Sequence, residues 1–184
     1  MLKSILIIFN KMIGTICNIN NQAVSRYCDQ IRSAFLTENG FVAKNSGAKR
    51  TQRDDWLTHN TPVVKELFLK DENQFVFIAD GTYCYIQKSS KHSFQRATWS
   101  VQKKRNLVKP FVLCATDGTI IDIYGPYEAR FNDAKIMELV LQDDKDLREL
   151  LRENDILIAD RGFRDCRKSI KSKYKIDVII PTCR

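Results

Sequence analysis

The hydrophobic and polar positions divide the chain into a helical first part and a strand-rich remainder. Up to about residue 40 the apolar residues recur with the spacing of a helix, and one stripe is formed by Val24, Tyr27, Cys28, Ile31 and Phe35. Asn20 and Asn21 precede this stripe, and asparagine is a favoured N-cap residue. The pattern predicts two helices, with the second beginning near Asn20.

After residue 74 the apolar residues come in short continuous runs, which are typical of buried strands. The runs predict strands at 75–79, 82–86, 107–115, 119–124, 155–159 and 177–180, with helices between 132 and 151 and after residue 163. Three antiparallel strands, a helix, a strand, a helix and a strand predict an α/β fold with a mixed sheet and flanking helices. This element order is the ribonuclease H-like one.

Two of these runs end in the same tripeptide, Ile-Ala-Asp, at Asp80 and at Asp160. Functional groups of a helix-covered sheet gather beyond the carboxyl ends of its strands, where two carboxylates could share a divalent metal. A structural reading is also open, because Asp-Gly is a common turn dipeptide and Asp160 could cap the following helix. Asp117-Gly118, between two strand-like runs, illustrates that reading and predicts a hairpin turn without chemistry.

The positive charge of the chain predicts a polyanionic partner. The formal net charge is +8 and the pI is about 9.2, values that favour nucleic acid. Residues 87–110 contain seven basic residues and no acid, and a second basic stretch begins at Arg161. A charged run is usually only a solvated face, but this reading fits the two stretches less well, because each directly follows one of the two Ile-Ala-Asp runs.

The six cysteines and two histidines show no metal-binding spacing, which predicts reduced thiols in a nuclear or cytoplasmic protein. The apolar run at residues 5–9 is too short to span a bilayer, so no membrane partner is expected. Neither a histidine-based triad nor a glycine-rich nucleotide loop is apparent.

Several blocks of the chain together resemble the DDE superfamily endonucleases, the transposases of the Harbinger type and their insertion-sequence relatives. The blocks are Ile78 to Tyr83, Lys103 to Pro110, Tyr124 to Tyr127 with Asn132 to Ala134, and Ile158 to Phe163 ending in Ile180-Pro181. The resemblance covers the chain from about Phe75 onward. It implies the ribonuclease H-like fold and Mg²⁺-dependent (or Mn²⁺-dependent) cutting and transfer of DNA strands by two metal ions.

The resemblance also implies roles for individual residues. Asp80 and Asp160 match two catalytic, metal-binding aspartates of the family. Asp133 matches an aspartate before the first core helix, either an auxiliary metal ligand or, the reading we favour, the cap of that helix. The residues expected to contact DNA phosphates are Lys103, Lys104, Arg105, Lys109 and Arg161.

The family's triad needs a third carboxylate, a Glu on a helix downstream of the second Asp. The acids after Asp160 are Asp165, which is too close to it, and Asp177, which begins a strand and would point from the wrong end. We therefore expect a C-terminally truncated, transposase-derived domain with impaired cleavage. The alternatives are a non-catalytic, transposon-derived DNA-binding or partner protein and a ribonuclease H-like nuclease unrelated to transposition.

The predicted organisation has three parts. Residues 1–40 resemble a helix-turn-helix with Arg26 facing DNA, although a plain helical pair is equally compatible. Residues 41–74 are expected to form a linker with a short helix, and residues 75–184 the endonuclease domain. The expected partner is DNA, and a homodimer remains open.

Overall fold

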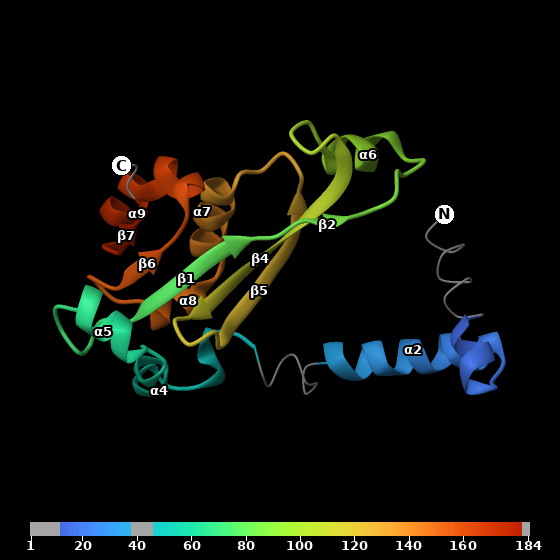
Figure 1. Ribbon diagram of the computed structural model, residues 1–184, viewed down its shortest axis with the longest axis horizontal. Coiled ribbons are helices and arrows are strands. Elements are labelled where there is room, and N and C mark those ends of the chain that lie inside the picture. The colour runs from blue at the N-terminus through green and yellow to red at the C-terminus, as the bar shows by residue number, and fades with distance from the viewer. Residues whose placement is uncertain (1–11, 38–45, 182–184) are drawn as a thin grey trace. The chain divides into compact units, whose positions relative to one another are not determined.

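The structure, a computed structural model, describes residues 12–37 and 46–181 of the 184 residues. The chain forms two compact units, Met1–Asn45 and Ser46–Arg184 (Figure 1). In these described ranges no helix has the length and apolar character needed to cross a membrane.

The described part of the first unit consists of two helical segments joined by a short turn. Residues 12–17 are helical, and α2 runs over Asn21–Leu36. The side chain of Asn20 accepts a hydrogen bond from the backbone N–H of Ala23 at 2.7 Å, so Asn20 is the N-cap that the sequence predicts. Residues 1–11 and 38–40, which were also predicted to be helical, lie outside the described residues.

Strands of the second unit pair into one mixed sheet. Among the described residues it has seven strands: β1 (Val76–Gly81), β2 (Cys84–Tyr85), β3 (Trp99–Ser100), β4 (Arg105–Ala115), β5 (Ile120–Glu128), β6 (Ile156–Ile158) and β7 (Asp177–Ile179). β4 is antiparallel to all four of its partners, β1, β2, β3 and β5, whereas β1, β6 and β7 run parallel to one another. This arrangement confirms the predicted ribonuclease H-like mixed sheet.

Helices flank the sheet on the side of the parallel strands (Figure 1). They are α7 (Asp133–Asp143), α8 (Lys145–Leu150), the 3-10 helix η2 (Arg161–Cys166) and α9 (Arg167–Tyr174). α7 supplies Ile136, Met137 and Leu141 to the core, where they meet the inward-facing residues of β1 and β4. All three side chains are fully buried, so α7 is held firmly against the strands that end at the predicted site.

The segment before β1, predicted as a linker with a short helix, contains three helices among its described residues. They are η1 (Ala48–Arg50), α4 (Arg53–Thr58) and α5 (Pro62–Phe68), and they belong to the same compact unit as the sheet. The short helix predicted from Pro62 onward is α5. Trp56 is fully buried, its ring centroid lies 6.1 Å from that of Phe75, and its indole N–H donates to the carbonyl of Ala48 at 2.9 Å. This tryptophan helps to attach the polar segment to the core.

A buried ion pair joins this segment to the starts of β1 and β6. The guanidinium of Arg53 binds both carboxylate oxygens of Asp155 at 2.7 and 2.8 Å, and its side chain is 8% exposed against 0% for Asp155. Asp155 also accepts hydrogen bonds from the backbone N–H groups of Phe75 and Arg152. The carboxylate thus fixes the residue before β1 next to the residue before β6, which sets the parallel register of the two strands.

β4 forms two hairpins, one with β5 and one with β3. The Asp117-Gly118 turn joins β4 to β5 as predicted, with Gly118 at φ 91°. By contrast, the basic stretch after β2 is more regular than expected, since it contains the helix α6 (His92–Thr98) and a hairpin of β3 with β4.

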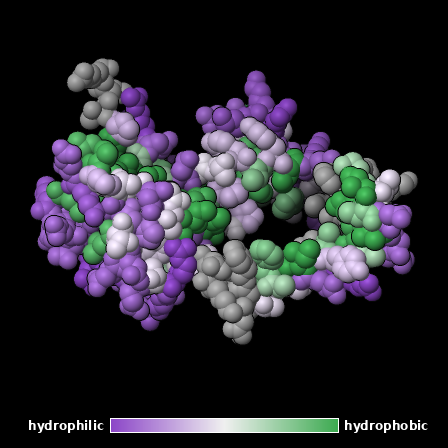
Figure 2. Space-filling model, turned by 60° about the horizontal axis from the view of Figure 1, so that its bottom comes forward, coloured by the Kyte–Doolittle hydropathy of each residue, from purple (hydrophilic) through white to green (hydrophobic). Residues whose placement is uncertain are grey.

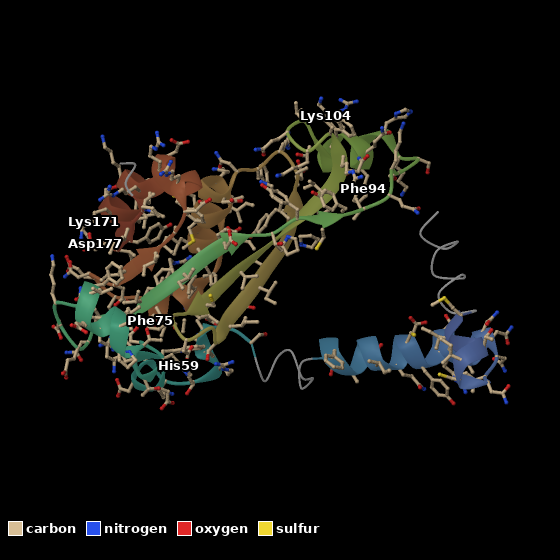
Figure 3. The ribbon with its side chains drawn as sticks, in the orientation of Figure 1. His59, Phe75, Phe94, Lys104, Lys171 and Asp177 are labelled. Atoms are coloured by element: carbon tan, nitrogen blue, oxygen red, sulfur yellow. The ribbon has the colours of Figure 1, made fainter. Side chains whose placement is uncertain are left out.

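Replacing Arg53 by methionine should lower the free energy of unfolding by about 3–5 kcal/mol, because Asp155 would remain buried without its counter-charge. Urea denaturation followed by circular dichroism measures this change. The matched control is Lys171→Gln. Lys171 and Asp177 also lie 2.7 Å apart, but their side chains are 47% and 45% exposed (Figure 3), so that loss should stay below about 1 kcal/mol. Equal losses in the two variants would contradict the structural role given to Arg53.

Candidate metal and DNA-cleavage site

Two predicted site residues, Asp80 and Asp160, end up level on neighbouring strands. β1 and β6 pair in parallel with Ile78 opposite Ile158. Continuing that register by two residues leads to Asp80 on one strand and Asp160 just beyond the other, and both are exposed. Because adjacent strands are about 4.8 Å apart, this edge of the sheet brings the two carboxylates together.

Asp160 has a local structural role as well. Its Oδ1 accepts a hydrogen bond from the backbone N–H of Gly162 at 2.8 Å and so caps η2. The capping role considered from the sequence is therefore confirmed. It occupies one oxygen, and a carboxylate has a second with which to bind a ligand.

Asp133 approaches the same edge from α7. The N-cap of α7 is Asn132, whose side chain accepts from the backbone N–H of Lys135 at 2.8 Å. The expectation that Asp133 is the cap is thus corrected, because the residue before it already satisfies that N–H group. Asp133 lies in the first turn instead, and a Cβ added at Gly81 would come within 2.6 Å of its Oδ1. Only glycine at position 81 leaves room for this carboxylate under β1.

The environment of Asp133 is unfavourable for its charge. Its Oδ1 is buried and has no hydrogen-bond partner. Burial raises the pKa of Asp133 above its ordinary value, the ammonium of Lys109 acts in the opposite direction, and the carboxylates of Asp160 and Asp80 add to the rise. A buried carboxylate oxygen that accepts no hydrogen bond and lies near two other carboxylates is a group that a cation would stabilise.

Lys109 is the cation nearest to this oxygen. Its ammonium donates to the carbonyl of Phe131 at 2.6 Å and lies 3.7 Å from Oδ1 of Asp133, which is an ion-pair distance too long for a hydrogen bond. The residue is only 7% exposed. The sequence suggested that Lys109 contacts DNA phosphates, but the structure places its charge inside, where it partly neutralises Asp133.

Tyr83 follows β1 and lies close to two lysines. The ammonium groups of Lys103 and Lys109 lie 5.1 and 5.2 Å from its ring centroid. Burial raises the pKa of the Tyr83 phenol, and the charges of Asp133, Asp160 and Asp80 raise it further. Tyr83 therefore stays protonated at neutral pH. The sequence places Tyr83 at the end of the block that begins at Ile78 but gives it no role, because its place between two lysines depends on contacts with distant residues.

The donor set suits a hard divalent cation in part. Two exposed carboxylates and one unsatisfied buried carboxylate oxygen are the oxygen ligands that Mg²⁺ and Mn²⁺ prefer. Nevertheless, no three His, Cys, Asp or Glu side chains within the described ranges converge closely enough to hold a metal as they stand. Asp80 and Asp160 would hold a metal here. Asp133 lies behind them, against Gly81.

The remaining basic residues of the prediction are exposed and lie in different places. Lys103 and Lys104 are in the turn between β3 and β4, and Arg105 begins β4. Arg161 directly follows Asp160 at the carboxylate edge. Arg26 belongs to α2 in the first unit, where its guanidinium lies 5.5 Å from the ring centroid of Tyr27. Its contact with DNA stays a prediction.

Replacing Gly81 by alanine should lower the free energy of unfolding by about 1–3 kcal/mol, because the new methyl group would overlap Asp133. Thermal or urea unfolding of four proteins gives the answer: the wild type, Gly81→Ala, Asp133→Ala and the double variant. The cost of the alanine should disappear when Asp133 is also truncated. An undiminished cost in the double variant would show that the two residues do not touch.

Comparison with known proteins agrees with this geometry. No curated protein and no solved structure matches the chain. A family model described as DDE superfamily endonuclease matches residues 79–180, which is more than half of the 184 residues. The matched part begins just before Asp80 and includes Lys109, Asp133 and Asp160, the residues that the fold gathers at one edge of the sheet. The chain therefore belongs to the DDE superfamily endonucleases.

Proposed function

We propose that the second unit binds Mg²⁺ or Mn²⁺ between Asp80 and Asp160 and cuts DNA strands, as a domain derived from a transposase. The observation that carries this proposal is the parallel register of β1 and β6, which brings both aspartates to the same edge. Family membership supports the same reading, since DDE superfamily endonucleases generally depend on divalent metals and act on DNA.

Each residue of the site has a distinct task in this proposal. Asp80 and Asp160 provide exposed carboxylate oxygens as ligands, and the buried Oδ1 of Asp133 adds negative potential behind them. The bound metal would polarise the scissile phosphate and make a water molecule more acidic. Arg161, adjacent to Asp160 and exposed, is placed to neutralise a phosphate next to the cut.

We further propose that cleavage by this unit is slow, because the third acidic group at the site is already partly neutralised. Asp177 pairs with Ile156 at the start of β6 and forms an ion pair with Lys171, so it lies at the opposite end of the sheet from the site. Asp165 is exposed on η2. Asp133 lies at the site itself, and the ammonium of Lys109 is 3.7 Å from its Oδ1.

The contact between Lys109 and Asp133 favours a second candidate function, a DNA-binding protein that no longer cuts. A buried ammonium beside a catalytic-site carboxylate does part of the electrostatic work of a metal ion. In this alternative the unit keeps its exposed basic surface and binds DNA without a metal.

Metal binding can be measured without any cleavage. Added Mg²⁺ or Mn²⁺ should stabilise the protein against unfolding by about 1.4 kcal/mol for each tenfold rise in free metal above its Kd. Asp80→Asn and Asp160→Asn should abolish this stabilisation, because each removes a charged ligand while keeping its shape. An asparagine at 160 can still accept from the N–H of Gly162. Differential scanning calorimetry measures the effect.

Asp165→Asn is the matched control, since Asp165 is exposed nearby but lies outside the site. Weak nicking of supercoiled DNA that disappears in Asp80→Asn and persists in Asp165→Asn supports the proposed slow nuclease. Rapid nicking would contradict the impairment. If the metal does not stabilise the protein and no nicking is seen, the second candidate function, DNA binding without cutting, is supported.

The exposed lysines of the β3–β4 turn should control the salt dependence of DNA binding. In Lys103→Gln/Lys104→Gln the slope of log K against log salt should shrink by about 0.9 for each duplex phosphate that the variant no longer neutralises. Fluorescence anisotropy at several salt concentrations measures it. The control with the same change in charge is Lys65→Gln/Lys70→Gln, in and after α5. An equal change in both double variants would mean that the net charge alone binds DNA.

A further inference from the structure

The antiparallel strands extend beyond the site and end in a projection. β1 pairs with the second half of β4, Phe111–Ala115, while the first half continues past Asp80 with β2 and β3 as its neighbours. We call α6 and the β3–β4 hairpin, residues 92–106, the tip. Lys104 and Phe94 lie in it, at the end of the sheet far from Phe75 (Figure 3).

A buried polar cluster holds the tip in shape. The side-chain amide of Asn106 donates to the carbonyl of Gln95 at 3.1 Å and to the hydroxyl of Thr98 at 3.0 Å. Asn106 and Thr98 are 7% and 2% exposed. The backbone N–H of Ala129 also donates to the carbonyl of Ala97, which joins α6 to the end of β5. The hairpin is thus attached to the sheet by its own hydrogen bonds and is not a loose loop.

Large apolar and aromatic side chains are nevertheless exposed on this ordered element. The exposed fractions are 45% for Phe94, 44% for Trp99 and 81% for Val101, and Tyr85 of the adjacent β2 is 55% exposed. Such residues cost free energy in water, and their gathering on one projection indicates a binding surface. Hydrophobic and hydrophilic residues lie side by side over much of the face of the molecule seen in Figure 2.

The charge around these side chains selects the class of partner. Between residues 87 and 110 the chain has seven basic residues and no acid. The guanidinium of Arg105 lies 5.4 Å from the ring centroid of Tyr85, so a cation and an aromatic ring are already in contact here. The neighbouring acid, Glu128, is paired with Arg130. Two copies of this surface would repel each other, whereas a polyanion with flat apolar groups complements it.

We propose that the tip is a stacking platform for unpaired DNA bases, with Trp99 as the main ring and the lysines of the turn holding the flanking phosphates. Single strands are bound in this way by aromatic rings between basic residues, whereas bases within a duplex are already stacked on each other. The proposal rests on DNA being the substrate of the proposed nuclease, and it adds which form of DNA is held and where.

The sheet also sets the distance between platform and cut. Trp99 pairs with Asn106, and Asp80 pairs with Val112, six residues further along β4. Six residues of strand span about 20 Å, which corresponds to roughly six nucleotides of a stacked strand. The unpaired bases would therefore lie on one side of the cleavage site, about half a helical turn away.

The two tryptophans of the chain make the test direct. Trp56 is fully buried, so a change of fluorescence on adding DNA reports on Trp99. The probes are an oligothymidylate strand and a blunt duplex hairpin of equal charge, both in EDTA so that no cleavage takes place. The expected result is quenching by the single strand, with Trp99→Ala weakening single-strand binding by about 5- to 150-fold and duplex binding by less than about twofold.

Three further variants make the outcome decisive. Trp99→Phe should retain most of the single-strand affinity, because a ring remains, and Leu67→Ala, at an exposed apolar residue of α5, should change nothing. Lys104→Gln should weaken the binding of both probes to a similar extent. The emission of Trp56 and circular dichroism confirm that Trp99→Ala is folded.

An unquenched Trp99 at saturating single strand, or an equal loss for both probes in Trp99→Ala, would overturn the stacking platform. A change in sedimentation coefficient in Trp99→Ala without any change in DNA affinity would overturn it in favour of a protein-binding surface. The stacking assay contains no metal, so it is independent of the nicking assay with Mg²⁺ or Mn²⁺. Stacking here together with no nicking in that second assay would reject the proposed nuclease and keep the platform, and nicking without stacking would do the reverse.

Discussion

The pairing of Arg53 with Asp155 is the constraint on which the geometry of this protein depends. A buried carboxylate must be neutralised and fully hydrogen-bonded, and Asp155 meets this need with one arginine from α4 and two backbone N–H groups. Because Asp155 precedes β6 and binds the N–H of the residue before β1, these hydrogen bonds align the beginnings of the two strands. Strands that start level and run parallel also finish level, so an ion pair at one end of the sheet determines where two aspartates emerge at the other.

At the opposite end of the sheet three carboxylates lie near one another, which is unfavourable while all are charged. The carboxylates of Asp80 and Asp160 help to raise the pKa of Asp133, and the fold tolerates the three acids by keeping two of them exposed and placing a buried lysine beside the third. Close approach of β1 to α7 is possible because position 81 has no side chain. The same arrangement would make the site receptive to a cation and, in its absence, costly to assemble.

The sequence predicted what depends on periodicity and on local chemistry. The apolar runs identified the strands, the repeated Ile-Ala-Asp identified Asp80 and Asp160, and Asn20 was recognised as a cap. What it missed depends on contacts between distant residues. Trp56 joins a polar segment to the core, Lys109 turns inward because β4 alternates between buried and half-buried positions, and α6 is fixed by Asn106 from a later strand. None of these partners is near its counterpart in the chain.

One continuous strand, β4, carries both the buried lysine behind the aspartates and the hairpin of the tip, and its residues alternate strictly from Leu107 to Ala115. Side chains that share one face of such a strand recur every two residues. Inserting one residue between Asn106 and Lys109 would turn either the lysine or the asparagine to the wrong face, whereas inserting two would preserve both and lengthen the span by about 7 Å. The spacing between the carboxylate edge of the sheet and the tip can therefore change only in steps of two residues.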